Sequence, residues 1–303
     1  MAKKRKGRPV SGIVLLDKPY DISSNKALQI VKNIYKAQKA GHTGSLDPLA
    51  TGMLPICLGE ATKVSGFLLD SDKSYSFDCK LGEVTSTGDI DGEVVKTFPI
   101  PELSEELINE VLASFIGEID QIPPMYSALK QDGKRLYELA RKGVEVKRKA
   151  RGVVIHDLKL LGFTEDTISL EVKCSKGTYV RSLAQDIAEK LESGAHVSRL
   201  HRIAVDPFPV EKMLTLDDLR ELQDKGLEEL DSVLLPTDSA LPQWPFIELT
   251  DDMVFYFRRG QELMLPGHDH ESLVKAYDPN GEFIGIAEGD GCGSYSPKKV
   301  FQL

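Results

Sequence analysis

The chain has 303 residues, of which 41% are hydrophobic and 28% charged, and its formal net charge is −9. This composition is typical of a globular protein with room for one large and one small domain. No apolar run reaches the ~20 residues of a transmembrane helix, and the N-terminus MAKKRKGRPV lacks the apolar core of a signal peptide. We therefore expect a cytoplasmic protein.

The charges are strongly polarised along the chain. The first eight residues carry five basic side chains and no acid, and we expect residues 1–10 to form a disordered basic tail. Residues 130–151 hold nine basic and three acidic side chains, whereas residues 211–239 hold nine acidic and three basic ones. Lys and Arg bind nucleic acid by displacing counterions from phosphates. The distribution favours an RNA-binding face backed by an acidic one, despite the negative total.

The N-terminal part of the chain predicts strands and helices in a mixed order. The run GIVLLDKP (12–19) predicts a buried strand, and a helix follows that begins near Ser24. Residues 74–81 alternate between polar and apolar, which predicts a half-buried strand. The pair Asp91-Gly92 then predicts a hairpin turn.

The middle of the chain continues this mixture. Ser104 is predicted to cap a helix that Gly117 ends. Residues 168–174 alternate as a strand and lead into a helix over 180–191 with apolar residues at helical spacing. Because strands and helices follow no steady βαβ rhythm, we predict an α+β fold and not a doubly wound sheet.

The pattern of the sequence changes after LPQWPF, near residue 245. A short helix capped by Thr250 is followed by strand-like runs between the turns LPGHD, DPNGE and GDGCGS. We therefore predict a large domain over residues 11–245 and a small β-rich domain over residues 246–303.

One carboxylate lies in an unusual setting, the loop GHTGSLDPLATG (41–52). Asp47 stands there between a leucine and a proline, with glycines and small hydroxyl residues around it. A surface turn could use Asp-Pro only because proline fixes its own φ and favours extended geometry before it. The loop alone leaves a structural and a catalytic role for Asp47 open.

The stretch GHTGSLDPLATGMLPICLGEATK (41–63) resembles the active-site segment of the TruB family of tRNA pseudouridine synthases. Five further stretches match in order along nearly the whole chain: LLDKP (15–19), KSY (73–75), PPMYSALK (123–130), KGTYVRSLAQD (176–186) and RLHRIAV (199–205). The resemblance implies a pseudouridine synthase domain with a mixed, mainly antiparallel sheet flanked by helices. It also implies that residues 246–303 form a PUA-like RNA-binding domain.

The activity implied by the resemblance is isomerisation of uridine to pseudouridine at position 55 of tRNA, in the T loop. It implies base flipping, no cofactor and no metal. We also expect no obligatory protein partner, and we favour a monomer, although the sequence leaves the oligomeric state open. Asp47 is implied as the nucleophile, attacking either C6 of the base or C1′ of the sugar. Elimination with Asp47 as a base is a third route, and the sequence does not separate the three.

Two further residues complete the catalytic set that the resemblance implies. Arg181 pairs with Asp47 and keeps it ionised, because a guanidinium has a fixed charge and a planar fork. Tyr75 stacks on the flipped uracil and is a candidate for handling the C5 proton. The plain alternative for Tyr75 is a core tyrosine with a satisfied hydroxyl.

Four residues are implied in substrate binding. His42 fills the gap left in the T loop, Tyr179 orients the acid and the arginine, and Leu200 forms an apolar wall. Lys18 lies at the pocket rim. By sequence alone, His42, Leu200 and Lys18 could instead be ordinary structural residues.

The basic residues fall in an insertion, about residues 124–152, that in the family closes over the T arm. We expect this basic insertion to be mobile without RNA and to be ordered by phosphates. The RNA-binding side chains implied here are Lys130, Lys134, Arg135, Arg141, Lys142, Lys147, Arg148 and Lys149.

Two rival functions follow from the same residues. One is a non-catalytic RNA-binding or RNA-folding protein, although a pure binder has no use for an ionised aspartate facing RNA. The other is a glycoside hydrolase, which would require two carboxylates at the scissile bond, where the loop offers one. His268 and His270 lack the partners expected of a metal site, so we predict none.

Overall fold

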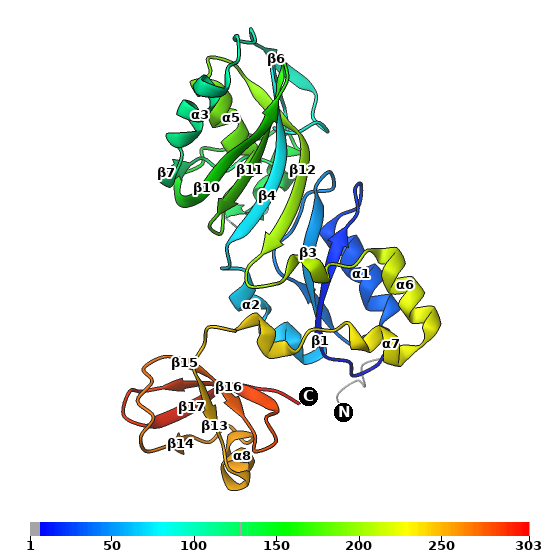
Figure 1. The fold of residues 1–303 in the computed structure, drawn as a ribbon, viewed down its shortest axis with the longest axis vertical. Coiled ribbons are helices and arrows are strands. Elements are labelled where there is room, and N and C mark those ends of the chain that lie inside the picture. Colours follow the sequence, from blue (N-terminus) through cyan, green and yellow to red (C-terminus); the bar gives the residue numbers. More distant parts are fainter. Residues whose placement is uncertain (1–6, 128, 132, 303) are drawn as a thin grey trace.

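The computed structural model describes residues 7–127, 129–131 and 133–302. It shows a long sheet flanked by helices and a smaller β-rich unit at the C-terminus (Figure 1). The predicted α+β class is confirmed. The acid Asp132 and the basic side chains before residue 7, both counted above, lie outside the described residues.

An eight-stranded sheet forms the frame of the larger unit. Its order is β1-β3-β12-β4-β11-β10-β7, with β2 pairing to β3. All neighbours are antiparallel except β3 and β12, which are parallel. The strands are β1 (Gly12–Lys18), β2 (Ala40–His42), β3 (Thr51–Leu58), β4 (Lys73–Leu81), β7 (Gly117–Gln121), β10 (Arg151–Phe163), β11 (Thr167–Cys174) and β12 (Ala195–Val205).

Strand β1 is covered on both faces, which explains its continuous apolar run. Ile13 and Leu15 pack into one core cluster, and Val14 and Leu16 pack into another. A strand that is buried on one face only would alternate with polar residues. Residues 74–81 show that alternation, and Phe77 and other inward residues of β4 are buried as predicted.

Helices cover the two ends of the sheet separately (Figure 1). The helices α1, α6 and α7 pack near β1, while α3 and α5 pack near β10 and β12. None of the helices in the described ranges is long and apolar enough to cross a membrane. The helices are α1 (Ser24–Ile34), α2 (Ser65–Leu68), α3 (Glu105–Ala113), α5 (Val180–Lys190), α6 (Leu216–Lys225) and α7 (Leu227–Ser232), with 3-10 turns η1 (Gly59–Lys63), η2 (Val210–Lys212) and η3 (Thr237–Ala240).

Two groups of short elements lie between the long strands along the chain. The hairpin β5 (Glu83–Thr85) and β6 (Val94–Thr97) contains the predicted Asp91-Gly92 turn in its loop. The basic insertion joins β7 to β10, which are neighbours in the sheet. It holds β8 (Lys130–Gln131), β9 (Lys134–Arg135) and α4 (Leu136–Ala140).

The C-terminal unit is a five-stranded sheet with one helix. Phe283, Ile286 and Phe301 pack into the same core cluster as Ile13 and Met53 of the larger unit. This burial of apolar surface holds the two units together. The strands run in the order β13 (Phe246–Glu248), β15 (Leu273–Tyr277), β16 (Phe283–Gly289), β17 (Ser294–Val300) and β14 (Leu263–Met264), and the helix is α8 (Asp251–Phe257).

The prediction of a disordered tail over residues 1–10 is wrong for Arg8. Its N–H donates to the carbonyl of Lys36 at 2.6 Å, and its carbonyl accepts from the N–H of Gln38 at 3.1 Å. Its guanidinium pairs with Asp231 of α7, with one N to O distance of 3.2 Å. The acidic segment supplies the carboxylate that fixes this basic residue.

Candidate active site

Asp47 lies on the loop between β2 and β3, and this loop is fixed on both sides of the carboxylate. The hydroxyl of Ser24 accepts from the N–H of Leu46 at 2.7 Å and donates to its carbonyl at 3.0 Å. The side chains of Leu46 and Leu49 are both buried in the core. The Leu-Asp-Pro-Leu pattern therefore anchors the loop by its leucines and leaves Asp47 facing outward.

Lys18 does not line the two cavities that Asp47 lines, so the prediction that it lies at the rim of the Asp47 pocket is wrong. Its side chain is fully buried beneath the loop. Its ammonium donates to the carbonyls of Pro19 and Ile22 at 2.8 Å and of Pro48 at 3.3 Å. Burial lowers the pKa of Lys18 to about 8, while the charge of Asp47 opposes this shift. Lys18 thus supports the loop from below by binding carbonyl groups.

Gly52 marks the point where the loop enters β3 and runs close to β12. Its φ is +99°, and an added Cβ would lie 2.2 Å from the carbonyl oxygen of Arg202. Both the positive φ and the close approach exclude a larger side chain here. This contact fixes the end of the Asp47 loop against the strand that carries Arg202.

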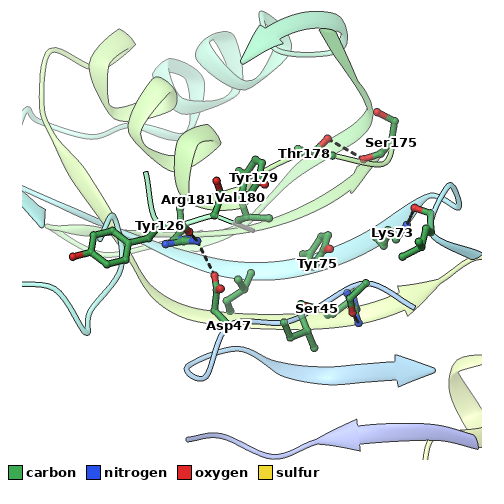
Figure 2. A pocket seen from close by; sticks show the side chains of 17 residues that line it. Ser45, Asp47, Lys73, Tyr75, Tyr126, Ser175, Thr178, Tyr179, Val180 and Arg181 are labelled. Carbon is green, nitrogen blue, oxygen red and sulfur yellow. Dashed lines mark hydrogen bonds and ion pairs between the residues drawn. The ribbon is translucent and has the colours of Figure 1, made fainter. Parts of the chain in front are cut away.

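Arg181 forms the centre of a charged cluster with Asp47 (Figure 2). Its Nη2 lies 2.9 Å from Oδ2 of Asp47 and 2.7 Å from the carbonyl of Tyr126. Its Nη1 lies 3.3 Å from Oδ2 of Asp89 and donates to the carbonyl of Thr87 at 2.9 Å. One buried cation is therefore shared between two carboxylates.

The pKa of Asp47 is raised above its ordinary value. Burial is the largest cause, the positive charge of Arg181 opposes it, and the negative charge of Asp89 adds to it. The side chain is still 42% exposed, and it lines a cavity. This position combines access for a substrate with protein on most sides of the carboxylate.

Asp47 and Arg181 line a pocket of about 310 Å³. Tyr75, Tyr179 and Leu200 line it as well, so the structure brings five predicted residues together. Tyr75 comes from β4, Leu200 from β12, and Tyr179 directly precedes α5. The volume is at the lower end of the ~300 to 1,000 Å³ of ligand sites, which suits one small ring.

The pocket opens into a groove of about 810 Å³ that shares Asp47, Tyr126 and Arg181 with it. His42 lines this groove, and its Nδ1 is buried without a hydrogen-bond partner among the described residues. Burial lowers the pKa of His42, with the charge of Arg202 adding to the effect. A neutral imidazole therefore faces the groove.

The basic insertion forms part of the wall of the same groove. Lys130, Arg135 and Arg141 line it. Arg148 instead donates to the carbonyl of Pro123 and pairs with Glu145, each at 3.3 Å. The other predicted RNA-binding residues are exposed but do not line the groove: Lys134, Lys142, Lys147 and Lys149.

Sequence reasoning missed two charged residues of this site. Asp89 is 4% exposed and binds Arg181, and Arg202 is 1% exposed and lines the pocket. Asp89 was missed because it lies in a turn-like stretch, where an acidic side chain is normally expected to face solvent. Arg202 lies in the stretch RLHRIAV (199–205). A charged side chain within this strand-like segment was the feature that could have indicated its role.

Three family models cover most of the chain. Residues 32–180 match the TruB family pseudouridylate synthase N-terminal domain. Residues 181–242 match the tRNA pseudouridylate synthase B C-terminal domain, and residues 245–301 match the pseudouridine synthase II TruB C-terminal domain. The chain belongs to the TruB family. The boundary between the second and third family models, near residue 245, coincides with the start of the β-rich unit.

Curated TruB relatives match over nearly the full length. The tRNA pseudouridine synthase B of Nitrosococcus oceani is 48% identical, covering 99% of this chain and 98% of the relative. The tRNA pseudouridine synthase B of Escherichia coli (strain K12) is 47% identical, covering 98% and 97%.

Solved structures show the same fold. A chain in the crystal structure of a Cbf5-Nop10-Gar1 complex superposes with a TM-score of 0.75 at 26% identity, covering 96% of this chain and 85% of that one. A chain of an H/ACA RNP bound to a substrate RNA superposes with a TM-score of 0.75 at 24% identity, covering 100% and 92%. The second likeness shows the fold alone.

Proposed function

We propose that this protein isomerises a uridine of tRNA to pseudouridine, and that this uridine is at position 55 in the T loop. The observation that carries the proposal is the Asp47–Arg181 pair, 2.9 Å apart, in a pocket that opens into a groove lined by basic residues. Membership of the TruB family supports the reaction, since the curated relatives are tRNA pseudouridine synthases.

The reaction is balanced without any external reactant. The bond between N1 and C1′ breaks, the uracil turns, and a new bond forms between C5 and C1′. The proton leaves C5, and a proton is gained at N1. Asp47 serves as the nucleophile at C1′ or at C6, or as the base of an elimination. Each route needs the ionised carboxylate, which Arg181 favours against the effect of burial.

The other pocket residues bind the uracil and position Arg181. Tyr75 offers a π-face to the flipped uracil, because a base taken out of its loop loses its stacking partners. Leu200 forms the apolar wall, and Tyr179 holds the position before α5 that brings Arg181 to Asp47. Lys18 supports the loop from below and does not contact the substrate.

The groove accounts for binding of the T arm. Lys130, Arg135 and Arg141 face phosphates from the basic insertion, and neutral His42 fills the space that the flipped base leaves. The insertion becomes ordered when RNA binds. The β-rich unit over residues 246–303 adds a further RNA contact as a PUA-like domain. The protein works as a monomer in the cytoplasm, where its tRNA substrate is found, without an obligatory protein partner.

An unmodified tRNA transcript provides the test. After incubation with this protein, carbodiimide treatment and primer extension map each pseudouridine to one nucleotide. A single stop at position 55 is the expected result, and a transcript with cytidine at that position gives none. Tight tRNA binding without any pseudouridine would refute the proposal and favour a non-catalytic RNA-binding protein.

A further inference from the structure

Arg202 is a cation that is buried at the pocket without a carboxylate to balance it. It is 1% exposed, and it lines the pocket that Asp47 lines. None of the ion pairs within the described residues includes it. Arg181, in contrast, is neutralised by Asp47 and Asp89.

Backbone carbonyls hold the Arg202 side chain in place. Its Nε donates to the carbonyl of Met53 at 2.7 Å, and its Nη2 donates to the carbonyl of Gly44 at 3.3 Å. Arg202 is also paired with Tyr75 in the register of β12 and β4. The Tyr75 hydroxyl is a third partner of the guanidinium. A guanidinium has five N–H donors, so these three partners leave hydrogen-bonding capacity unused. The group is fixed in position and still able to bind a ligand.

The charge of Arg202 reaches several groups around the pocket. Burial raises the pKa of Tyr75, and the guanidinium opposes that rise. Burial lowers the pKa of Lys73 to about 8, and Arg202 adds to this shift. A buried, unpaired cation is strongly disfavoured, which indicates that its counterpart is a negative charge that arises in the pocket itself.

The proposed isomerisation creates such a charge. When the bond from N1 to C1′ breaks, its electron pair stays with the uracil and spreads over N1 and the two carbonyl oxygens. Attack at C6 also places negative charge on the base. We propose that Arg202 is a catalytic residue that donates hydrogen bonds to a carbonyl oxygen of the uracil and stabilises this charge. The charge disappears when C5 bonds to C1′ and loses its proton.

This inference rests on the proposed function, and leaving-group chemistry tests it separately. Two tRNA transcripts carry uridine or 5-fluorouridine at the target position. Fluorine withdraws electrons and stabilises the uracil anion, so cleavage needs less help from the protein. Fluorine cannot leave C5 as a proton does, so the product of 5-fluorouridine keeps its fluorine after C5 bonds to C1′, and water adds to its N1–C6 double bond. Single-turnover conversion to pseudouridine, or to this hydrated 5-fluoro product, is measured by nucleoside digestion and mass spectrometry, at saturating protein, for the parent, Arg202→Met and Arg202→Lys.

For Arg202→Met we expect conversion of uridine to slow by about 100-fold, the typical loss for one donor to a developing oxyanion. With 5-fluorouridine the loss should shrink to about 10-fold or less, because the base stabilises its own charge. Affinity for tRNA should change by less than about 3-fold, since the charge forms only during reaction. Arg202→Lys should fall between Arg202→Met and the parent.

Equal losses with both nucleotides would overturn the inference, because they would show that Arg202 only holds Gly44 and Met53 in place. A parent-like rate for Arg202→Met would overturn it as well. If Arg202→Met does not fold, Arg202→Lys carries the same comparison, because lysine keeps the charge and lacks the planar fork. Failure of the parent to convert uridine would refute the proposed function itself, whatever the variants do.

Discussion

The pocket around Asp47 and the basic insertion hold their charges in opposite surroundings. In the pocket, Asp47 and Arg181 are within 2.9 Å of each other, and packed strands and helix ends surround them. In the insertion, Lys134 and Lys142 are exposed; Lys134 begins the two-residue strand β9, and Lys142 lies in the turn after α4. Buried charges are suited to chemistry, and exposed charges are suited to reversible binding. Substitutions in the pocket should therefore alter the rate of isomerisation, and substitutions in the insertion should alter the affinity for tRNA.

The largest effect is expected for Asp47→Asn. Isomerisation should fall below detection, at least about 10⁴-fold, because the amide is no nucleophile and no base. Affinity for tRNA should remain within about 3-fold, since the groove is unchanged. Rapid-quench assays and filter binding measure the two quantities.

Stability supplies the control for this variant. Because the folded-state pKa of Asp47 is raised, the ionised carboxylate at neutral pH costs stability that a neutral amide does not. The free energy of unfolding of Asp47→Asn should therefore equal or exceed that of the parent. A strongly destabilised variant would contradict the assignment of the loss to chemistry.

The next effect concerns the basic wall of the groove. Replacing Lys130, Arg135 and Arg141 by glutamine should weaken tRNA binding by about 10- to 100-fold and reduce the salt slope by about 2 to 3. The rate at saturating protein should stay near that of the parent. Binding titrations between 50 and 200 mM salt measure both changes.

A matched variant removes the same charge elsewhere. Lys80, Lys159 and Arg220 are each paired with a carboxylate and do not line the groove. Their replacement by glutamine should leave the affinity and the salt slope unchanged. Equal weakening in both variants would show that total charge, and not the groove, binds the RNA.

A smaller effect is expected on the pH dependence. The rate should fall as the pH drops through the raised pKa of Asp47, because protonation removes the reactive carboxylate. Asp89→Asn deletes a negative charge that raises this pKa, so the acid limb should move to lower pH. Single-turnover pH profiles show the shift, and movement to higher pH would contradict the account.

The smallest effect is expected at the N-terminus. Arg8→Ala should lower the free energy of unfolding by about 0.5 to 1 kcal/mol, because the pair with Asp231 is partly exposed. The rate and the tRNA affinity should not change. Urea titrations measure the stability, and a loss of tRNA affinity would instead place Arg8 in RNA binding.

Local patterns explain which features could be predicted from the sequence. Helix α1 was predictable because Ala27, Val31 and Ile34 repeat at helical spacing and all face the core. The loop of Asp47 could be found by its resemblance. The prediction for Lys18 was wrong because a lysine before a proline normally marks an exposed strand end. In the structure its ammonium is buried and binds the carbonyl of Pro48, 30 residues later in the chain.

Contacts between distant segments could not be predicted in this way. Asp89 meets Arg181 across 92 positions of the chain, and Arg202 reaches the carbonyl of Met53 across 149. Such pairings depend on the order of strands in the sheet, which periodicity does not determine. Both residues also occur in segments where a charged side chain normally faces solvent.

The division between chemistry and binding can be tested in one measurement. A tRNA transcript with tritium at C5 of uridine is mixed with saturating amounts of the parent, of Asp47→Asn and of the triple variant of Lys130, Arg135 and Arg141. Isomerisation must expel the C5 hydrogen, so released tritium reports turnover. The account predicts that the triple variant reaches the rate of the parent and that Asp47→Asn releases none. Release by Asp47→Asn, or a triple variant that stays slow at saturation, would contradict it.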